Sequence, residues 1–237
     1  MKKGVFGLAV LLSAAIAVPS AEAVTFSAVG NTTTQNFSAD VDGPGGNGPI
    51  TATATLTVAS ISLTQLVLNV QLTNTTTAAS GFTTVGLEAF GFSIDPNAVS
   101  VTGTTTGAND TGSDRDDFTG YSLDSIASLK NVEICSWAGN SCKGGPQGDL
   151  LHFGETDFFR LTITFPSNNA DSTYDLADFG AKFQTNLQSY EFYASSGTTT
   201  VTPSTHNEES GNAPEPALLS MLGAGLAGVA YRIRRRS

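Results

Sequence analysis

The stretch ITATATLTVASISLTQLVLNVQLTN, residues 50–74, decides the fold. Thr, Val, Leu and Ile dominate it, and these residue types favour strands. In its second half Leu66, Leu68, Val70 and Leu72 alternate with other residues. Alternation of this kind places one set of side chains on one face of an extended chain, as in a half-buried strand. We therefore expect two strands here, with a bend at residues 59–65.

Similar patterns lie on both sides of this stretch. Further strands are expected at residues 24–28, 85–94, 98–105, 159–165, 179–183 and 190–194. Residues 85–94 and 98–105 are predicted to pair with each other through the turn Asp95-Pro96-Asn97. Residues 40–49 are predicted to form a Gly/Pro-rich loop. Residues 123–129 are predicted to form at most a turn or two of helix. Short strands separated by turn signals predict an all-β fold, an antiparallel β-sandwich of jelly-roll or immunoglobulin-like type, over residues 24–194.

The two ends have other patterns. Lys2 and Lys3 precede an apolar segment and then the small-residue stretch Pro19–Ala23. This order predicts a secretory signal peptide over residues 1–23, cleaved after Ala23. Residues 195–213 are rich in Ser, Thr, Gly and Asn and predict a flexible linker.

Residues 214–237 have three parts. Pro214-Glu215-Pro216 comes first, and an apolar run at residues 217–231 follows. A run of about 15 residues makes a short transmembrane helix, since a full span needs about 20. The basic stop consists of Arg232, Arg234, Arg235 and Arg236. Arginines stay on the cytoplasmic side, so everything before Pro214 is expected outside.

This order of tripeptide, apolar helix and basic end resembles the PEP-CTERM sorting signal of Gram-negative envelope proteins. The resemblance implies that an exosortase, a membrane-embedded processing enzyme, recognises Pro214-Glu215-Pro216. It also implies a precursor held transiently in the inner membrane and a mature protein at the cell surface or in the extracellular matrix. Proteins of this kind usually occur in bacteria that make exopolysaccharide, which implies a role in the biofilm or envelope.

The expected exported part, residues 24–213, is strongly acidic. It contains 5 basic and 19 acidic residues, a net charge of −14. Nucleic acid and anionic lipid are poor partners for such a surface. Cations and neutral or basic polymers stay open as partners.

Cys135 and Cys142 are the only cysteines. The six residues between them include Gly139-Asn140 and suit a tight loop closed by a disulfide, and export favours its oxidation. The segment at residues 131–145 is also similar to the cysteine-pair region of a PEP-CTERM subgroup called the cistern family.

The densest acidic stretch contains Asp110, Asp114, Asp116 and Asp117. Oxygen-rich loops of this sort hold calcium in other proteins, although the spacing does not match an EF-hand. A solvated loop explains the same residues. Calcium is the one cofactor that the sequence suggests.

No catalytic residue stands out. His152 is the only histidine outside the linker, and the chain has no Gly-x-Ser-x-Gly motif. We expect a structural or adhesive surface protein without enzymatic activity. The first alternative is a carbohydrate-binding module, calcium-assisted or not, with exposed aromatic residues such as Trp137, Tyr121 and Tyr193 stacking on sugars, although core packing would use the same residues. The second alternative is a secreted hydrolase.

Overall fold

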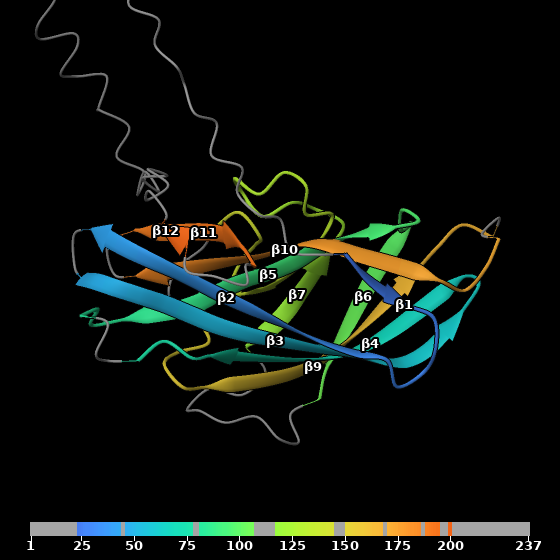
Figure 1. Ribbon diagram of the computed structural model, residues 1–237, viewed down its shortest axis with the longest axis horizontal. Helices are drawn as coiled ribbons and strands as arrows, with labels where there is room; N and C mark the ends of the chain where they lie inside the picture. Colours follow the sequence, from blue (N-terminus) through green and yellow to red (C-terminus); the bar gives the residue numbers. More distant parts are fainter. Residues whose placement is uncertain are drawn as a thin grey trace, which may run out of the picture.

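The computed structural model describes residues 23–43, 46–77, 81–106, 117–144, 150–167, 170–185 and 188–194, together with the backbone of Thr199 and Thr200. These residues form two sheets packed face to face (Figure 1). The strands are β1 (Val24–Phe26), β2 (Thr32–Gly43), β3 (Gly46–Ser62), β4 (Gln65–Asn74), β5 (Val85–Asp95), β6 (Ser100–Thr105), β7 (Phe118–Ser122), β8 (Ile134–Ala138), β9 (Thr156–Thr164), β10 (Tyr174–Thr185), β11 (Ser189–Tyr193) and β12 (Thr199–Thr200).

Each sheet has six strands. Sheet A has the order β1-β10-β5-β8-β7, and β11 also pairs with β10. Sheet B has the order β12-β2-β3-β4-β9-β6. All pairs are antiparallel except the two-residue pairing of β12 with β2. The predicted all-β antiparallel architecture is confirmed.

The stretch at residues 50–74 forms the centre of sheet B. Strand β3 pairs with β2 on one side and with β4 on the other. Its small and aliphatic residues, Ile50, Ala52, Ala54, Leu56 and Val58, are buried, and the threonines between them are half-buried. A register shift between Val58 and Ser60 supplies the bend. Both predicted strands are therefore present.

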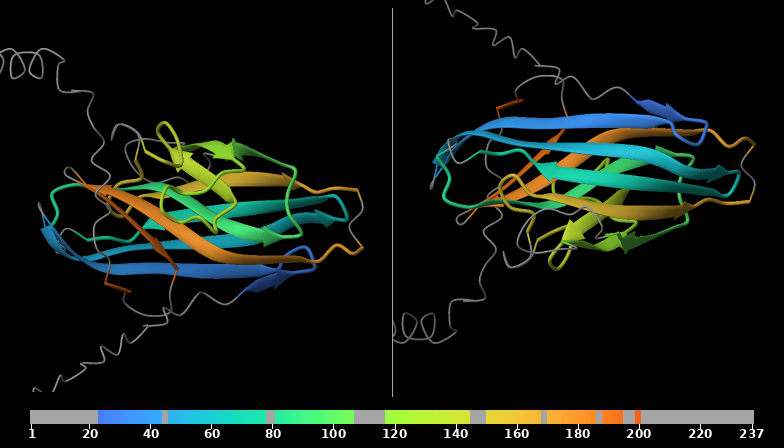
Figure 2. Two further views of the ribbon diagram at one scale, coloured as in Figure 1. Left: turned by 90° about the horizontal axis from the view of Figure 1, so that it is seen from above. Right: turned by 90° about the horizontal axis from the view of Figure 1, so that it is seen from below.

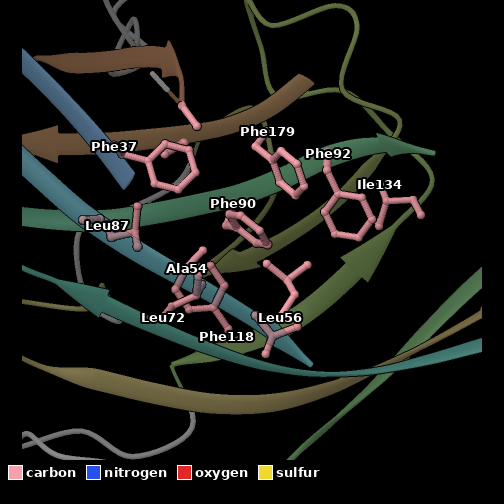
Figure 3. Close-up of a cluster of buried hydrophobic side chains, with 14 of the residues drawn as sticks. Phe37, Ala54, Leu56, Leu72, Leu87, Phe90, Phe92, Phe118, Ile134 and Phe179 are labelled. Atoms are coloured by element: carbon pink, nitrogen blue, oxygen red, sulfur yellow. The ribbon is translucent and has the colours of Figure 1, made fainter. Parts of the chain in front are cut away.

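Aromatic side chains fill the space between the sheets (Figure 3). The ring of Phe37 on β2 meets that of Phe90 on β5 edge to face, with 6.1 Å between the ring centroids. Phe118 on β7 and Phe159 on β9 are stacked at 5.6 Å. Both pairs join one sheet to the other, and such contacts stabilise a core beyond the area that they bury.

The predicted loop at residues 40–49 was wrong, because its described residues belong to β2 and β3. Asp40 pairs with Pro49, and the ladder continues as far as Gly43 and Gly46. Glycine is needed at the end of this hairpin. A Cβ atom on Gly46 would lie 2.7 Å from the carbonyl oxygen of Gly81, so the close approach of two backbones, rather than strand propensity, selects the residue type.

The predicted pairing of residues 85–94 with residues 98–105 was also wrong. Both strands exist, but β5 lies in sheet A beside β10 and β8, whereas β6 lies at the edge of sheet B beside β9. The turn at Asp95-Pro96-Asn97 therefore carries the chain from one sheet to the other. Turn chemistry marks a change of direction but does not say which strand the chain meets next.

Residues 123–129 form turns and an isolated bridge between Ile126 and Leu129, not a helix. Short strands β7 and β8, which the sequence analysis did not identify, flank this segment. Among the described residues, no helix is long and apolar enough to cross a membrane. The predicted transmembrane helix lies outside those residues.

Candidate functional site

The residues predicted to direct sorting lie outside the described part of the chain. These are Pro214, Glu215 and Pro216 with Arg232, Arg234, Arg235 and Arg236, and the signal peptide up to residue 22 lies outside it as well. Of the predicted linker, only Thr199 and Thr200 are described, and their backbone pairs with Ala39 and Asp40 on β2.

The predicted disulfide is present. Cys135 on β8 and Cys142 in the following loop are joined, with their Cα atoms 6.2 Å apart. Both cysteines are buried in a cluster with Ile126, Leu129 and Val132. This cluster packs on Ala89 of β5, on the side of sheet A away from the core. The disulfide therefore braces a cover over the outer face of sheet A, formed by residues 123–133 and 139–144 on either side of β8.

A buried ion pair lies beneath this cover. The Nζ of Lys182 on β10 lies 3.2 Å from Oε2 of Glu88 on β5, and the two side chains are 3% and 1% exposed. Lys182 Nζ also donates to the carbonyl oxygen of Lys143 at 2.8 Å. Glu191 on β11 accepts from the backbone N–H of Ser128 at 2.6 Å. A buried charge is stable only when it has an opposite charge or a hydrogen-bond partner. Because Lys143 and Ser128 belong to the cover, their contacts with Lys182 and Glu191 fix the cover to sheet A.

A groove of about 470 Å³ opens beside the cover. Asp95 and Asp175 are direct cross-strand partners at this place. Ser93 Oγ donates to Asp178 Oδ2 at 3.1 Å, and the N–H of Ile94 donates to Glu133 Oε2 at 3.2 Å. The lining residues are Ser93, Ile94, Asp95, Asn97, Lys130, Asn131, Glu133, Asp175, Ala177 and Asp178. The groove is thus acidic and polar.

The electrostatics of the groove extend to Tyr193. Burial raises the pKa of its phenol, a hydrogen bond to the backbone of Asn131 lowers it, and the charge of Asp178 raises it again. The net result is a pKa above the ordinary value. Tyr193 therefore stays neutral beside the carboxylates at ordinary pH.

Of the predicted calcium ligands, Asp110, Asp114 and Asp116 lie outside the described residues. Asp117 is described and is 4% exposed. In the described ranges, no group of three or more His, Cys, Asp or Glu residues is arranged to hold a metal ion. Calcium binding stays a prediction of the sequence.

The three aromatic residues expected to be exposed are half-buried and take part in packing. Trp137 lies over Gly120, where a Cβ atom would come within 1.9 Å of the indole ring. Tyr121 meets Phe159 with 5.7 Å between the ring centroids, and Tyr193 packs against the disulfide cluster. Packing, the other interpretation of these residues, therefore accounts for part of each side chain, and stacking on sugars stays a prediction.

His152 is half-buried in a short connection rather than in a strand. Its backbone N–H donates to Glu155 Oε2 at 2.7 Å, and the preceding Leu151 forms an isolated bridge with Leu87. The geometry around His152 is that of a turn held to the core.

The outer face of sheet B is a polar surface that the sequence analysis did not identify. We call it the threonine face. Its side chains are Thr32, Thr34, Asn36 and Ser38 on β2, Thr51, Thr53, Thr55 and Thr57 on β3, Gln65, Val67, Asn69, Gln71 and Thr73 on β4, Thr156, Phe158, Arg160, Thr162 and Thr164 on β9, and Ser100, Thr102 and Thr104 on β6. The signal was present in the sequence, as threonine at every second position of residues 51–57.

Comparison with known proteins bears on the C-terminus. A family model described as PEP-CTERM protein-sorting motif matches residues 212–236. The resemblance seen in the sequence is thereby confirmed, and the motif implies exosortase-dependent export and processing of a membrane-anchored precursor. No curated protein and no solved structure matched the chain.

Proposed function

We propose that this protein is a structural or adhesive component of the cell surface or exopolysaccharide matrix of a Gram-negative bacterium. The carrying observation is the PEP-CTERM motif at residues 212–236. It follows a β-sandwich from which residues 201–211 separate it. In this proposal the tail holds the exported chain in the inner membrane until an exosortase-type enzyme processes it.

The described domain suits an extracellular role. A disulfide of the kind favoured outside the cytoplasm braces the cover of sheet A. The net charge of −14 over residues 24–213 keeps the surface soluble and disfavours nucleic acid as a partner. The proposal assigns no enzymatic activity and no catalytic residue.

Two changes in the tail test the delivery step. Deleting residues 217–237 removes the apolar run and the arginines, so a folded protein should be released into the periplasm. Replacing Pro214, Glu215 and Pro216 with alanine keeps the anchor but removes the extended shape that proline imposes. This variant should accumulate as a full-length membrane-bound precursor.

The matched control is Pro203→Ala, which removes a proline from the linker and leaves the motif intact. It should be processed and localised like the unmodified protein, as judged by cell fractionation and gel mobility. Normal processing of the triple-alanine variant would show that the tail serves only as an anchor, and the proposal would fall.

A second candidate function, carbohydrate binding, is favoured by a specific observation. The threonine face presents hydroxyl and amide groups over five neighbouring strands. Hydroxyl and amide groups form hydrogen bonds with the hydroxyls of sugars.

A further inference from the structure

The threonine face differs in charge from the rest of the domain. Strands β2, β3, β4, β9 and β6 contain four charged residues, namely Asp40, Asp42, Asp157 and Arg160. Asp157 is buried, and the other two aspartates lie at the hairpin end of β2. Arg160 is therefore the one charge in the middle of a polar face, although residues 24–213 have a net charge of −14.

The face is ordered in rows. Thr32, Thr57, Asn69, Arg160 and Thr104 are successive cross-strand neighbours on β2, β3, β4, β9 and β6. With strands about 4.8 Å apart, this row spans about 19 Å. The right-hand view of Figure 2 shows β2, β3, β4 and β9 side by side across this face. A surface of this length fits an extended polymer better than a single sugar.

The next row lies two residues along each strand. It consists of Thr34, Thr55, Gln71 and Phe158. Phe158 is half-buried and lies beside the exposed Gln71 of the neighbouring strand. An aromatic ring flanked by amide and hydroxyl groups offers a sugar an apolar surface for its C–H groups and partners for its hydroxyls.

Contacts within the face hold these groups in place. The hydroxyls of Thr34 and Thr55 lie 3.0 Å apart, and those of Thr73 and Thr156 lie 2.9 Å apart. Arg160 Nε donates to Asn69 Oδ1 at 2.9 Å. A hydroxyl has one donor and two acceptor sites, so each pair keeps capacity for a ligand. Since the groups are already ordered, binding costs less side-chain entropy.

We propose that the threonine face binds a neutral polysaccharide through hydroxyl and amide hydrogen bonds, with Asn69, Gln71 and Phe158 at its centre. This inference rests on the proposed function, because it names the surface and the ligand class that the adhesive role requires. An acidic polymer is repelled by the net charge of the domain. A basic polymer is drawn instead to the carboxylates of the groove at Asp95 and Asp175.

Affinity electrophoresis tests the proposal. The full chain, purified in a neutral detergent, is run on native gels containing hydroxyethyl cellulose, guar galactomannan, dextran, alginate or chitosan. At least one of the three neutral polymers should retard the protein, and alginate should not. Asn69→Ala with Gln71→Ala should raise the dissociation constant about tenfold through the loss of two hydrogen bonds.

Phe158→Ala should weaken binding further, and far-ultraviolet circular dichroism checks its fold. If this variant does not fold, the exposed pair Asn69 and Gln71 still tests the face. The matched control is Asn131→Ala, which removes an exposed amide from the groove on sheet A. It should bind like the unmodified protein.

Three results would overturn the inference. They are the absence of retardation by any neutral polymer, unchanged binding by the Asn69/Gln71 variant, and an equal loss in Asn131→Ala. Sedimentation of the unmodified protein adds a further outcome. A dimer that the Asn69/Gln71 variant dissociates would show that a second copy, not a glycan, occupies the face.

Failure of the inference differs from failure of the proposed function. In cells, the Asn69/Gln71 variant should be exported and processed normally but washed more easily from the matrix. A protein at the cell surface that binds no neutral polymer leaves the proposed function intact and removes the inference. Binding of a neutral polymer by a protein that stays in the periplasm would support the inference and contradict the proposed function.

Discussion

The outer faces of the two sheets are built in opposite ways. On sheet A, residues 123–133 and 139–144 cover the sheet, Glu88 and Lys182 form an ion pair beneath the cover, and Cys135 and Cys142 brace it. On sheet B, the outer face carries rows of threonine and amide side chains, and its residues are half-buried or exposed. One face is stabilised from within, whereas the other presents polar groups outward.

We expect this difference to separate stability from recognition. A covered face loses stability when one of its partners is removed, because the charge left behind is buried. An exposed polar face tolerates substitution, because water replaces the lost partner. Changes on sheet A should therefore alter unfolding, and changes on sheet B should alter binding.

The largest effect is expected at the buried ion pair. Lys182→Met leaves Glu88 without its buried cation and should lower the free energy of unfolding by about 3–5 kcal/mol. Adding Glu88→Leu should restore most of the loss, since apolar residues replace a buried pair at little cost. Urea denaturation measures both changes. A double variant as unstable as Lys182→Met alone would contradict this account of the pair.

The next effect concerns the disulfide. Cys135→Ser opens a loop of eight residues and should lower stability by roughly 2.5 kcal/mol, less any strain that it relieves. Thiol titration of the native protein should find no free thiol. Glycan binding should be unchanged, because Cys135 lies on the opposite sheet from the threonine face. Two reactive thiols in the native exported protein would contradict the assignment of a disulfide that holds the cover in place.

A smaller effect is expected on sheet B. Thr55→Val keeps the β-branched shape and removes one hydroxyl of the pair with Thr34. Its cost should be within about 0.2–1 kcal/mol, the range of cross-strand pairs. Thermal unfolding measures it. A loss as large as that of Cys135→Ser would mean that this face also carries the stability of the fold.

The smallest effect is expected at alkaline pH. The pKa of Tyr193 is raised in the fold, chiefly by burial. The unfolded chain therefore loses this proton first, near pH 10, and stability should fall as the pH rises above that value. Comparing urea midpoints at pH 9 and pH 11 measures the fall, which Tyr193→Phe should reduce. An equal loss of stability in Tyr193→Phe would show that other titrating groups cause the fall.

The sequence predicts the strands better than their partners. Alternation at Leu66–Leu72 and at Phe159–Phe165 identifies β4 and β9, because burial of one face leaves a local period of two. The assignment of β5 and β6 to different sheets depends on contacts far apart in the chain, so no local pattern reveals it. The pairing of Asp40 with Pro49 was missed because residues rich in glycine and proline predict a loop. At Gly46 the structure requires glycine for a different reason, the close approach of two backbones.

The candidate surfaces show the same limit. The Cys135–Cys142 pair was predictable from spacing and export, since both are properties of the chain. The threonine face was not recognised, because its rows arise only when five strands lie in register. The sequence left exposure and core packing open for Trp137 and Tyr193, and the structure shows both half-buried against the disulfide cluster.

One measurement tests the proposed delivery to the cell surface most directly. Cells are separated into cytoplasmic, inner-membrane, periplasmic and matrix fractions, and both ends of the protein are identified by mass spectrometry. We predict a matrix-associated chain that begins at Val24 and lacks the apolar run at residues 217–231. A full-length chain that still carries this run and stays in the inner membrane would contradict the proposed function.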